Sequence, residues 1–346
     1  MSITSKDIAK LAGVSRSAVS AVMNGHYNKV SLEKREKILA IAHDLRYRPN
    51  PAALGLAKKN TRTIGLITSP FISNIYSDLV SKISFILNEK KYSCSIILPT
   101  DTEQEMEAIS RFESFGADGI IVAYALNDIR KLRNKIPIVS MSPHPGQYEV
   151  RADLKSATAT AVKHFREHKQ RKIGFICPQL SVVPQQWEGY LEAVGKKQAY
   201  RLEVTGNPRL NEEFEHLLKD INVRAWVVTN DLLAARVMHY MIAQGYSIPE
   251  NAAIIGFDGA ALAEITPVPL STMVFPASRL AEACVKILLD KIENNDIGFN
   301  ETPLLVDPVL HIGRSCGCPV SAPATVQWAG QRLTFDNDEG KNVGTI

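Results

Sequence analysis

The chain has 346 residues, of which 45% are hydrophobic and 22% are charged, and its formal net charge is +4. This length exceeds that of one ordinary domain, and the composition is typical of a globular protein. The sequence contains no run of about 18 apolar residues that could span a membrane. The N-terminus lacks the charged and apolar blocks of a secretory signal and the five cysteines are scattered, so we expect a cytoplasmic protein without a disulfide framework.

Positive charge is concentrated at the N-terminal end. The first 62 residues hold twelve Lys and Arg residues against four Asp and Glu residues, a net charge of +8, which leaves −4 for the rest of the chain. A basic unit on a mildly acidic body is typical of a polyanion-binding module joined to a domain that does not bind polyanions. The alternative is a solvated basic surface with no nucleic-acid partner.

Three short helices are predicted in the first fifty residues. Thr4 and Asp7 fit a capping box that begins the first helix. Gly13 interrupts that helix, and Ser15 is a suitable N-cap for the second. A third helix, from about Ser31 to Leu45, covers the apolar face of the second. Two short helices joined through a glycine and covered by a third form a helix-turn-helix, and the alternative is a three-helix bundle with no nucleic acid.

The second of these helices is the one that would enter the major groove of DNA. Its early exposed residues, Arg16 and Ser17, are placed to reach base edges. Ser15, Ser20 and Asn24 are better placed for phosphates, which fix the register without reading the base sequence.

A short hinge helix is predicted next. Asn50 caps it and Pro51 occupies its first position, where the missing N–H costs nothing. Two turns containing Gly55 are too short to be stable alone in water, so the segment would order on meeting DNA and a second copy of the chain. Leu54 or Leu56 could wedge between base pairs in the minor groove. The alternative is an ordinary linker whose leucines pack on the body.

From residue 63 onward, apolar strands alternate with amphipathic helices such as Tyr76–Lys90. This order predicts an α/β fold with parallel sheets, and two successive series indicate two similar lobes with a ligand cleft beyond the carboxyl ends of the strands. The strands are expected at Thr63–Thr68, Ser93–Leu98, Gly119–Ala123 and Ile136–Met141, and then at Lys172–Cys177, Arg201–Val204, Trp226–Thr229 and Ala253–Phe257.

Polar and aromatic residues follow several of these strands and form the candidate pocket. Each has a structural alternative, because Asp and Asn after a strand often cap the next helix, as we expect of Asp231. The candidates are Ser69, Asp153, Gln186, Trp187, Asn230, Asp231 and Asp258.

Several motifs together resemble the LacI/GalR family of bacterial regulators. The DNA-binding part of the resemblance is the run from Lys6 to Ser15, the pairs Val19-Ser20, Asn24-Gly25 and Val30-Ser31, and the segment Tyr47-Arg48-Pro49-Asn50. The body adds Thr229-Asn230-Asp231 and the run from Ile254 to Asp258, and the resemblance extends to about Ser315. It implies a helix-turn-helix three-helix domain followed by a periplasmic-binding-protein-like two-lobed core with parallel sheets.

The resemblance also implies a function. We expect a repressor that binds a near-palindromic DNA operator as a homodimer and responds to a sugar or sugar-like effector, with no enzymatic activity, cofactor or metal. The expected divisions are a DNA-binding domain at 1–48, a hinge at 49–62, an effector-binding and dimerisation domain at 63–315 and a flexible tail at 316–346. Induction is favoured by the family, and corepression or activation stay open.

The family pattern places contact residues in both parts of the chain. Paired hinge helices insert one leucine per subunit, and Leu56 is in that register. The further DNA contacts that it implies are Thr4, Tyr47, Asn50 and Ala53. The effector contacts that it implies are Ser69, Asp153, Gln186, Asn230 and Asp258.

Four positions depart from the family pattern. Ala21 stands where an Arg usually follows Val-Ser, and Gly55 replaces a larger hinge residue. Gln186 replaces an Arg of many sugar-binding members, and Gly259 replaces a second acidic residue. Because Gln carries no charge, a neutral sugar or nucleoside-like effector is favoured over an anionic one that relies on that Arg. The stacking candidates for such a ligand are Trp187, Tyr76 and Phe71.

Three rival interpretations are disfavoured. Ser315 lies in a G-x-S-x-G pattern, but no His follows His311 to complete a hydrolase triad. Cys316 and Cys318 could form a metal or redox pair, yet thiols one residue apart lack the spacing of a zinc site and no second Cys pair is present. A solute-binding protein without a DNA function does not account for the basic N-terminal unit.

Overall fold

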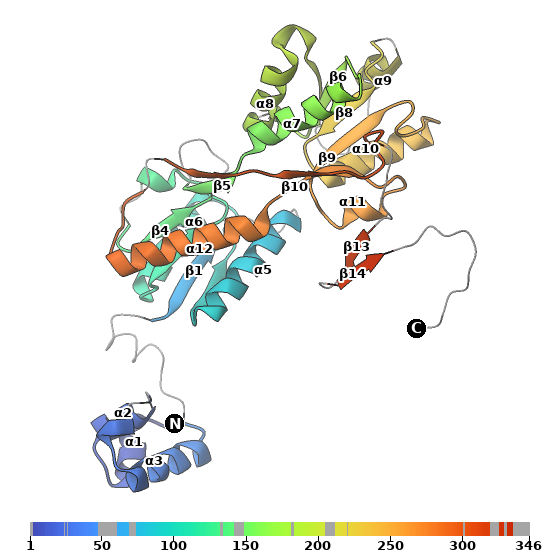
Figure 1. Cartoon of the computed structure of the whole chain (residues 1–346). Coiled ribbons are helices and arrows are strands. Elements are labelled where there is room, and N and C mark those ends of the chain that lie inside the picture. The colour runs from blue at the N-terminus through green and yellow to red at the C-terminus, as the bar shows by residue number, and fades with distance from the viewer. Residues whose placement is uncertain are drawn as a thin grey trace, which may run out of the picture.

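The computed structural model describes residues 3–23, 25, 27–47, 61–68, 74–131, 134–141, 149–180, 183–204, 212–219, 221–299 and 302–318, together with the backbone of two strands at 325–328 and 331–334. Figure 1 shows a small helical unit at the N-terminus and two α/β lobes. Within the described ranges, no helix has both the length and the apolar character needed to cross a bilayer.

The N-terminal unit contains the three predicted helices, α1 (Ser5–Ala12), α2 (Arg16–Met23) and α3 (Leu32–Asp44), with a 3-10 turn at Tyr27–Lys29. The predicted capping box is confirmed, because the Thr4 hydroxyl accepts from the Asp7 N–H and the Asp7 carboxylate accepts from the Thr4 N–H at 2.9 Å. Gly13 ends α1 with a φ of 67°, a left-handed conformation that glycine adopts without strain. The helices enclose a core of Ile8, Ala9, Ala12, Val19, Val22 and Ile38.

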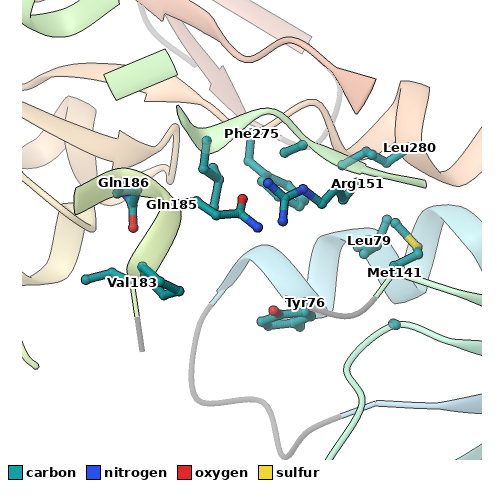
Figure 2. Close-up of a pocket in the computed structure, with 13 residues that line it drawn as sticks. Tyr76, Leu79, Met141, Arg151, Val183, Gln185, Gln186, Phe275 and Leu280 are labelled. Atoms are coloured by element: carbon teal, nitrogen blue, oxygen red, sulfur yellow. The ribbon is translucent and has the colours of Figure 1, made fainter. Parts of the chain in front are cut away.

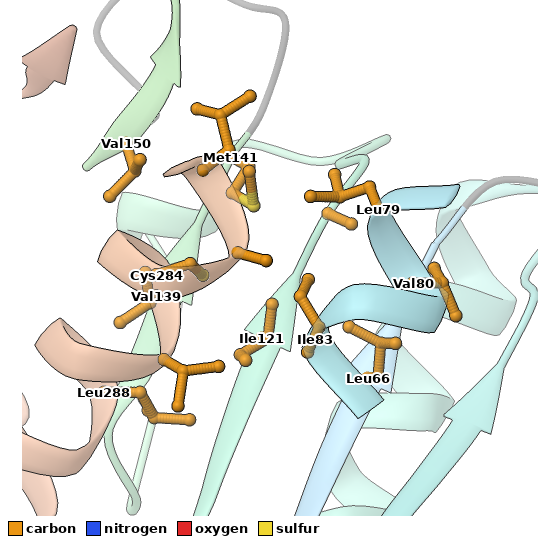
Figure 3. Close-up of a cluster of buried hydrophobic side chains, with 14 of the residues drawn as sticks. Leu66, Leu79, Val80, Ile83, Ile121, Val139, Met141, Val150, Cys284 and Leu288 are labelled. Carbon is orange, nitrogen blue, oxygen red and sulfur yellow. The ribbon is translucent and has the colours of Figure 1, made fainter. Parts of the chain in front are cut away.

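The first lobe is a four-stranded parallel sheet in the order β2-β1-β3-β4, as the alternating pattern predicted. Its strands are β1 (Thr63–Ile67), β2 (Ser93–Ile97), β3 (Gly119–Val122) and β4 (Ile138–Ser140). One face is covered by α5 (Asn74–Glu89) and α12 (Ala277–Asn294), and α6 (Thr102–Ser114) packs on the other. Figure 3 shows Ile83 of α5 and Leu288 of α12 meeting over Ile121 of β3.

The second lobe is a six-stranded sheet in the order β12-β10-β9-β8-β6-β7, in which only β12 is antiparallel to its neighbour. Its strands are β6 (Ile173–Cys177), β7 (Tyr200–Glu203), β8 (Ala225–Val228), β9 (Ala253–Asp258), β10 (Ser271–Val274) and β12 (Val309–His311). Its helices are α7 (Leu154–Glu167), α8 (Pro184–Val194), α9 (Glu212–Lys219), α10 (Asp231–Ala243) and α11 (Leu262–Ile265). The four predicted strands of the second series are confirmed.

Two short strands run between the lobes and position the cleft. They are β5 (Val150–Ala152) and β11 (Leu304–Val306), which pair in parallel, and Figure 1 shows them where the chain passes from one lobe to the other. Directly before β5, the carboxylate of Glu149 lies 2.9 Å from Lys291 Nζ of α12, and both side chains are at most 4% exposed. This buried ion pair fixes the start of the crossing strand to the first lobe.

The structure describes three parts of the segment that was predicted as a flexible tail, residues 316–318, 325–328 and 331–334. Cys316, where that tail was predicted to begin, is 1% exposed and belongs to the core of the second lobe. Farther along, β13 (Thr325–Trp328) and β14 (Gln331–Thr334) form an antiparallel hairpin. Ala329 and Gly330 separate two β-prone runs there, which is a two-residue hairpin pattern that the sequence analysis did not use.

Candidate DNA-binding helix and effector cleft

The outer face of α2 carries the residues that were predicted to contact DNA. Arg16, Ser17 and Ser20 are exposed, whereas Val19 and Val22 on the other side of the helix are at most 1% exposed. Helical periodicity separates the two sets, because residues three and four apart share a face. The apolar set anchors α2 to the other helices and leaves the polar set open to a ligand.

The start of α2 is fixed by serine side chains. Ser15 Oγ accepts a hydrogen bond from the Ala18 N–H at 3.2 Å and lies 2.8 Å from Ser17 Oγ. The predicted N-cap role of Ser15 is therefore confirmed. An exposed helix N-terminus carries partial positive charge and favours anions such as phosphate, so a contact with DNA and a cap are compatible at this position.

The remaining predicted DNA contacts differ in their exposure. Thr4 is exposed but its hydroxyl is 2.7 Å from the Asp7 carboxylate, and Tyr47 is half-buried against the helical core. After α2, the guanidinium of Arg35 lies 4.1 Å from the ring centre of Tyr27, a cation–π contact that the sequence analysis missed. The other predicted contacts lie outside the described residues: Asn24, Asn50, Ala53 and Leu56.

A cavity opens between the two lobes (Figure 2). The first lobe contributes residues of α5 and α12 to its wall and the second lobe contributes the start of α8, so a ligand here would touch both lobes. The wall is mainly apolar, with few polar groups, which is typical of small-molecule sites. The lining residues are Tyr76, Leu79, Ala123, Met141, Arg151, Ala152, Leu154, Val183, Pro184, Gln185, Gln186, Phe275 and Leu280.

Two of the predicted effector residues line cavities. Gln186 is 4% exposed, and its amide nitrogen donates to the carbonyl oxygen of Thr229 at 3.2 Å. Asp258 lines a second cavity that shares Phe275 with the first. Its φ of 121° is unusual for a residue with a side chain, and such strain is often found at binding sites.

Two others have the capping role that was left open for them. Asp153 accepts from the Ser156 N–H at 3.0 Å at the start of α7, and Asn230 accepts from the Leu233 N–H at 2.7 Å at the start of α10. Neither is among the residues that line the two cavities. Ser69 lies outside the described residues.

Arg151 is a charged cleft residue that was not predicted from the sequence. It belongs to β5, a three-residue strand that the pattern did not predict, and Figure 2 shows its guanidinium pointing toward Gln185. The replacement of a family Arg by Gln186 therefore does not leave the cleft without a cation. A guanidinium is always charged and favours carboxylate, phosphate or other oxygen acceptors.

The aromatic residues that were predicted to stack on a ligand differ in their positions relative to the cavity. Tyr76 lines the cavity and makes an edge contact with Tyr124 at 5.6 Å between ring centres, and burial raises the pKa of its hydroxyl. Trp187 instead packs on Tyr190 and Phe175 at 5.3 and 5.4 Å in the second-lobe core. Trp187 is not among the residues that line the cavity, so its role as a stacking residue stays a prediction, and Phe71 lies outside the described residues.

Asp231 supports the loop beside the cleft. The prediction that it caps α10 is wrong, because Asn230 is the cap. The buried carboxylate of Asp231 accepts from the Thr272 hydroxyl at 2.7 Å and from the Ala260 N–H at 2.8 Å. Burial raises the pKa of Asp231 to about 6. Burial, with Asp231 as a second cause, holds the pKa of Asp258 well above its usual range.

These raised pKa values give a stability prediction with a defined sign. The folded chain keeps its proton on Asp231 up to about pH 6, whereas the unfolded chain loses it near pH 4. The folded state is therefore favoured at acidic pH and loses this contribution as the pH rises through that window. From about pH 4.5 to about pH 7.5, we expect the wild type to lose about 2 kcal/mol more unfolding free energy than Asp231→Asn. Urea titrations of both proteins at the two pH values measure this difference, and equal losses would contradict it.

Comparison with known proteins agrees with both parts of the chain. Residues 4–50 match the profile described as bacterial regulatory proteins, lacI family, and residues 162–316 match a periplasmic binding protein-like domain. The chain is 30% identical over 327 residues to catabolite control protein A of Staphylococcus epidermidis, covering 89% of this chain and 97% of that protein. It is 29% identical over 315 residues to the NTD biosynthesis operon regulator of Bacillus subtilis, covering 84% and 93% of the two chains.

A solved structure shares the whole architecture. The lac repressor dimer bound to operator and the anti-inducer ONPF superimposes with a TM-score of 0.79 over 91% of this chain and 99% of that chain, at 22% identity. The fold predicted from the sequence, a helix-turn-helix followed by a two-lobed core, is therefore confirmed.

Proposed function

Because the chain belongs to the LacI family of bacterial regulatory proteins, we propose that α2 reads a DNA operator and that the cleft between the lobes binds the effector. The chain is a DNA-binding transcriptional regulator controlled by a small molecule, and it is not an enzyme. One observation carries the assignment of sites: a single chain joins an open polar helix face to a cavity whose wall comes from two lobes.

On the DNA side, we propose a homodimer on a near-palindromic operator. Each α2 would lie in the major groove, with Arg16 and Ser17 at base edges and with Ser15 and Ser20 at phosphates. The lac repressor of similar fold was solved as a dimer bound to operator, which supports this arrangement. The cytoplasm, where bacterial DNA lies, is the proposed location.

On the effector side, we propose a sugar or sugar-like molecule with oxygen acceptors. The amides of Gln185 and Gln186 can donate to and accept from hydroxyl groups, and Arg151 adds a fixed cation. Apolar walls, including Phe275, suit the C–H faces of a sugar ring. The cation extends the candidate ligands from neutral sugars to sugar acids and sugar phosphates.

The proposed mechanism is thermodynamic linkage between the two sites. An effector that touches both lobes favours one relative orientation of them, since only a differential affinity for two states can shift their equilibrium. The N-terminal unit of each subunit is joined to the first lobe along the chain. We propose that it moves with that lobe, so this shift would change how the paired recognition helices fit their half-sites. Repression relieved by the effector is the proposed sign.

Two experiments on the full-length protein test these assignments. Selection from a random DNA library should recover a sequence with approximate two-fold symmetry. Thermal-shift screening should show stabilisation by a member of the sugar, sugar-acid, sugar-phosphate or nucleoside set, because a ligand bound only to the folded state raises stability. If no sequence is enriched at low salt, the assignment of α2 fails.

Arg151 gives a prediction on effector affinity. Replacing it with Met keeps most of the side-chain volume and removes the charge, and hydrogen bonds to charged groups contribute about 1.5–3 kcal/mol. We expect the effector found by screening to bind about ten-fold to a hundred-fold more weakly to Arg151→Met in titration calorimetry. Arg166→Met, an exposed change on α7, is the control and should bind normally. Unchanged affinity in Arg151→Met would remove Arg151 from the proposed contacts.

A further inference from the structure

Two histidines, His164 in the last turn of α7 and His168 at its C-cap, meet the C-terminal segment on the second lobe. His164 and His168 are one helical turn apart, and their ring centres are separated by 4.7 Å. Cys318 Sγ lies 3.0 Å from His168 Nε2 and 3.4 Å from His164 Nε2. The ligating atoms of His164, Cys316 and Cys318 all lie within 4.8 Å of one another. Three donors, from His164, Cys316 and Cys318, thus lie close together, and His168 adjoins them through Cys318.

These separations fit one metal geometry. With zinc–sulfur and zinc–nitrogen bonds of about 2.3 and 2.0 Å, a tetrahedral site places its donor atoms roughly 3.3–3.8 Å apart. The distances from Cys318 Sγ to the two imidazole nitrogens, 3.4 and 3.0 Å, are within about 0.5 Å of that range. Binding of one ion by all four side chains requires a side-chain rotation that brings His168 closer to the other three donors. Two imidazoles and two thiolates are the donor set of structural zinc sites.

The cysteine segment is held in place independently of any ion. Ser315 Oγ donates to the Ile254 carbonyl oxygen at 2.6 Å and accepts from the Ser271 N–H at 2.8 Å, both in the second-lobe sheet. Gly317, with a φ of 88°, makes the turn that returns Cys318 toward α7, a backbone conformation that favours glycine. Cys316 is 1% exposed. A preorganised loop of this kind lowers the conformational cost of binding an ion.

We propose that His164, His168, Cys316 and Cys318 form a tetrahedral site for zinc that clamps the C-terminal segment to α7. No metal was expected from the sequence, because the Cys-Gly-Cys spacing alone does not place that pair beside α7. All four positions are filled by protein, which is typical of a structural site. The donors lie near the end of α7 that is remote from the cleft, so the metal stabilises the second lobe and is not part of effector binding.

Cobalt and zinc binding to untagged, reduced, full-length protein test the proposal. Cobalt should bind one ion per chain, with a thiolate-to-cobalt charge-transfer band and the strong visible bands of a tetrahedral site. Zinc affinity should fall at least about ten-fold in Cys318→Ser and in His168→Gln. Loss of a residue that only hydrogen-bonds to a metal ligand already weakens metal binding by about that factor, and loss of a ligand itself should cost no less. The matched controls Cys94→Ser and His239→Gln, half-buried and exposed positions elsewhere in the chain, should bind zinc as the wild type does.

Two results would overturn the site. One is a cobalt spectrum without a thiolate band, and the other is unchanged zinc affinity in Cys318→Ser. If either variant fails to fold, X-ray absorption of the zinc-loaded wild type decides instead, with two sulfur and two nitrogen ligands expected and a shell without sulfur contradicting the proposal. Operator binding and effector binding are measured separately from zinc binding. A protein that binds no zinc but still binds its operator and effector would therefore contradict only the zinc site, and not the proposed function.

Discussion

Replacing Arg16 with alanine is expected to lower operator affinity by about 100-fold or more. A bidentate contact between a side chain and a base edge contributes about 1–3 kcal/mol of discrimination, and a dimer uses it twice. Arg16 is exposed at the start of α2, so its removal leaves the helical core intact. Fluorescence anisotropy with the selected operator and with a scrambled duplex, at one salt concentration, measures both affinities.

The pattern of losses separates base reading from general charge. Arg16→Ala should lose far more affinity for the operator than for scrambled DNA. Lys34→Ala removes the same charge from an exposed position on α3 and should weaken both modestly, since a phosphate contact carries no sequence information. Equal losses on the two duplexes in Arg16→Ala would show that Arg16 contacts only the DNA backbone or none of it.

The buried ion pair between Glu149 and Lys291 is expected to have the largest effect on stability. Lys291→Met removes the cation that lies 2.9 Å from a carboxylate with 1% exposure, and breaking such a buried pair costs about 3–5 kcal/mol. The double variant Glu149→Leu/Lys291→Met should recover most of that loss, because it buries no charge. Urea unfolding of the full-length variants measures these free energies.

A surface pair provides the matched control for this measurement. Lys155 lies 2.8 Å from both Glu188 and Glu192, and the three side chains are 37%, 57% and 60% exposed, so Lys155→Met should cost about 1 kcal/mol at most. A loss in Lys291→Met as small as that in Lys155→Met would contradict the structural role of the buried pair. Glu149 directly precedes the strand that carries Arg151. A large loss of unfolding free energy in Lys291→Met would therefore also show that the ion pair stabilises the start of this strand.

The parts of the fold that were predictable from the sequence depend on local signals. The helical unit is marked by signals that each involve only a few neighbouring residues. They are the capping box at Thr4, the glycine after α1 and the N-cap at Ser15. The two series of apolar strands are equally local. By contrast, α12 follows the second-lobe strand β10 yet packs in the first lobe, and no periodicity within Ala277–Asn294 reveals which lobe it joins.

The site was only partly predictable for a related reason. Polar residues after strands were sound candidates, yet the same position serves as a helix cap, and Asp153 and Asn230 cap helices outside the cavity walls. Arg151 lies in a three-residue strand that owes its existence to pairing with Leu304–Val306. The histidine–cysteine cluster joins residues 150 or more positions apart. Such contacts follow from tertiary packing, which a single sequence does not display.

Occupation of the cleft should change the affinity of the same chain for its operator. The most direct test titrates the full-length protein against its selected operator, with and without a saturating amount of the effector found by thermal shift. We expect operator affinity to change by at least about five-fold, the lower end of typical coupling between sites, and Arg151→Met to need more effector to reach the same change. An effector that binds the cleft and leaves operator affinity unchanged would show that the two sites are not coupled.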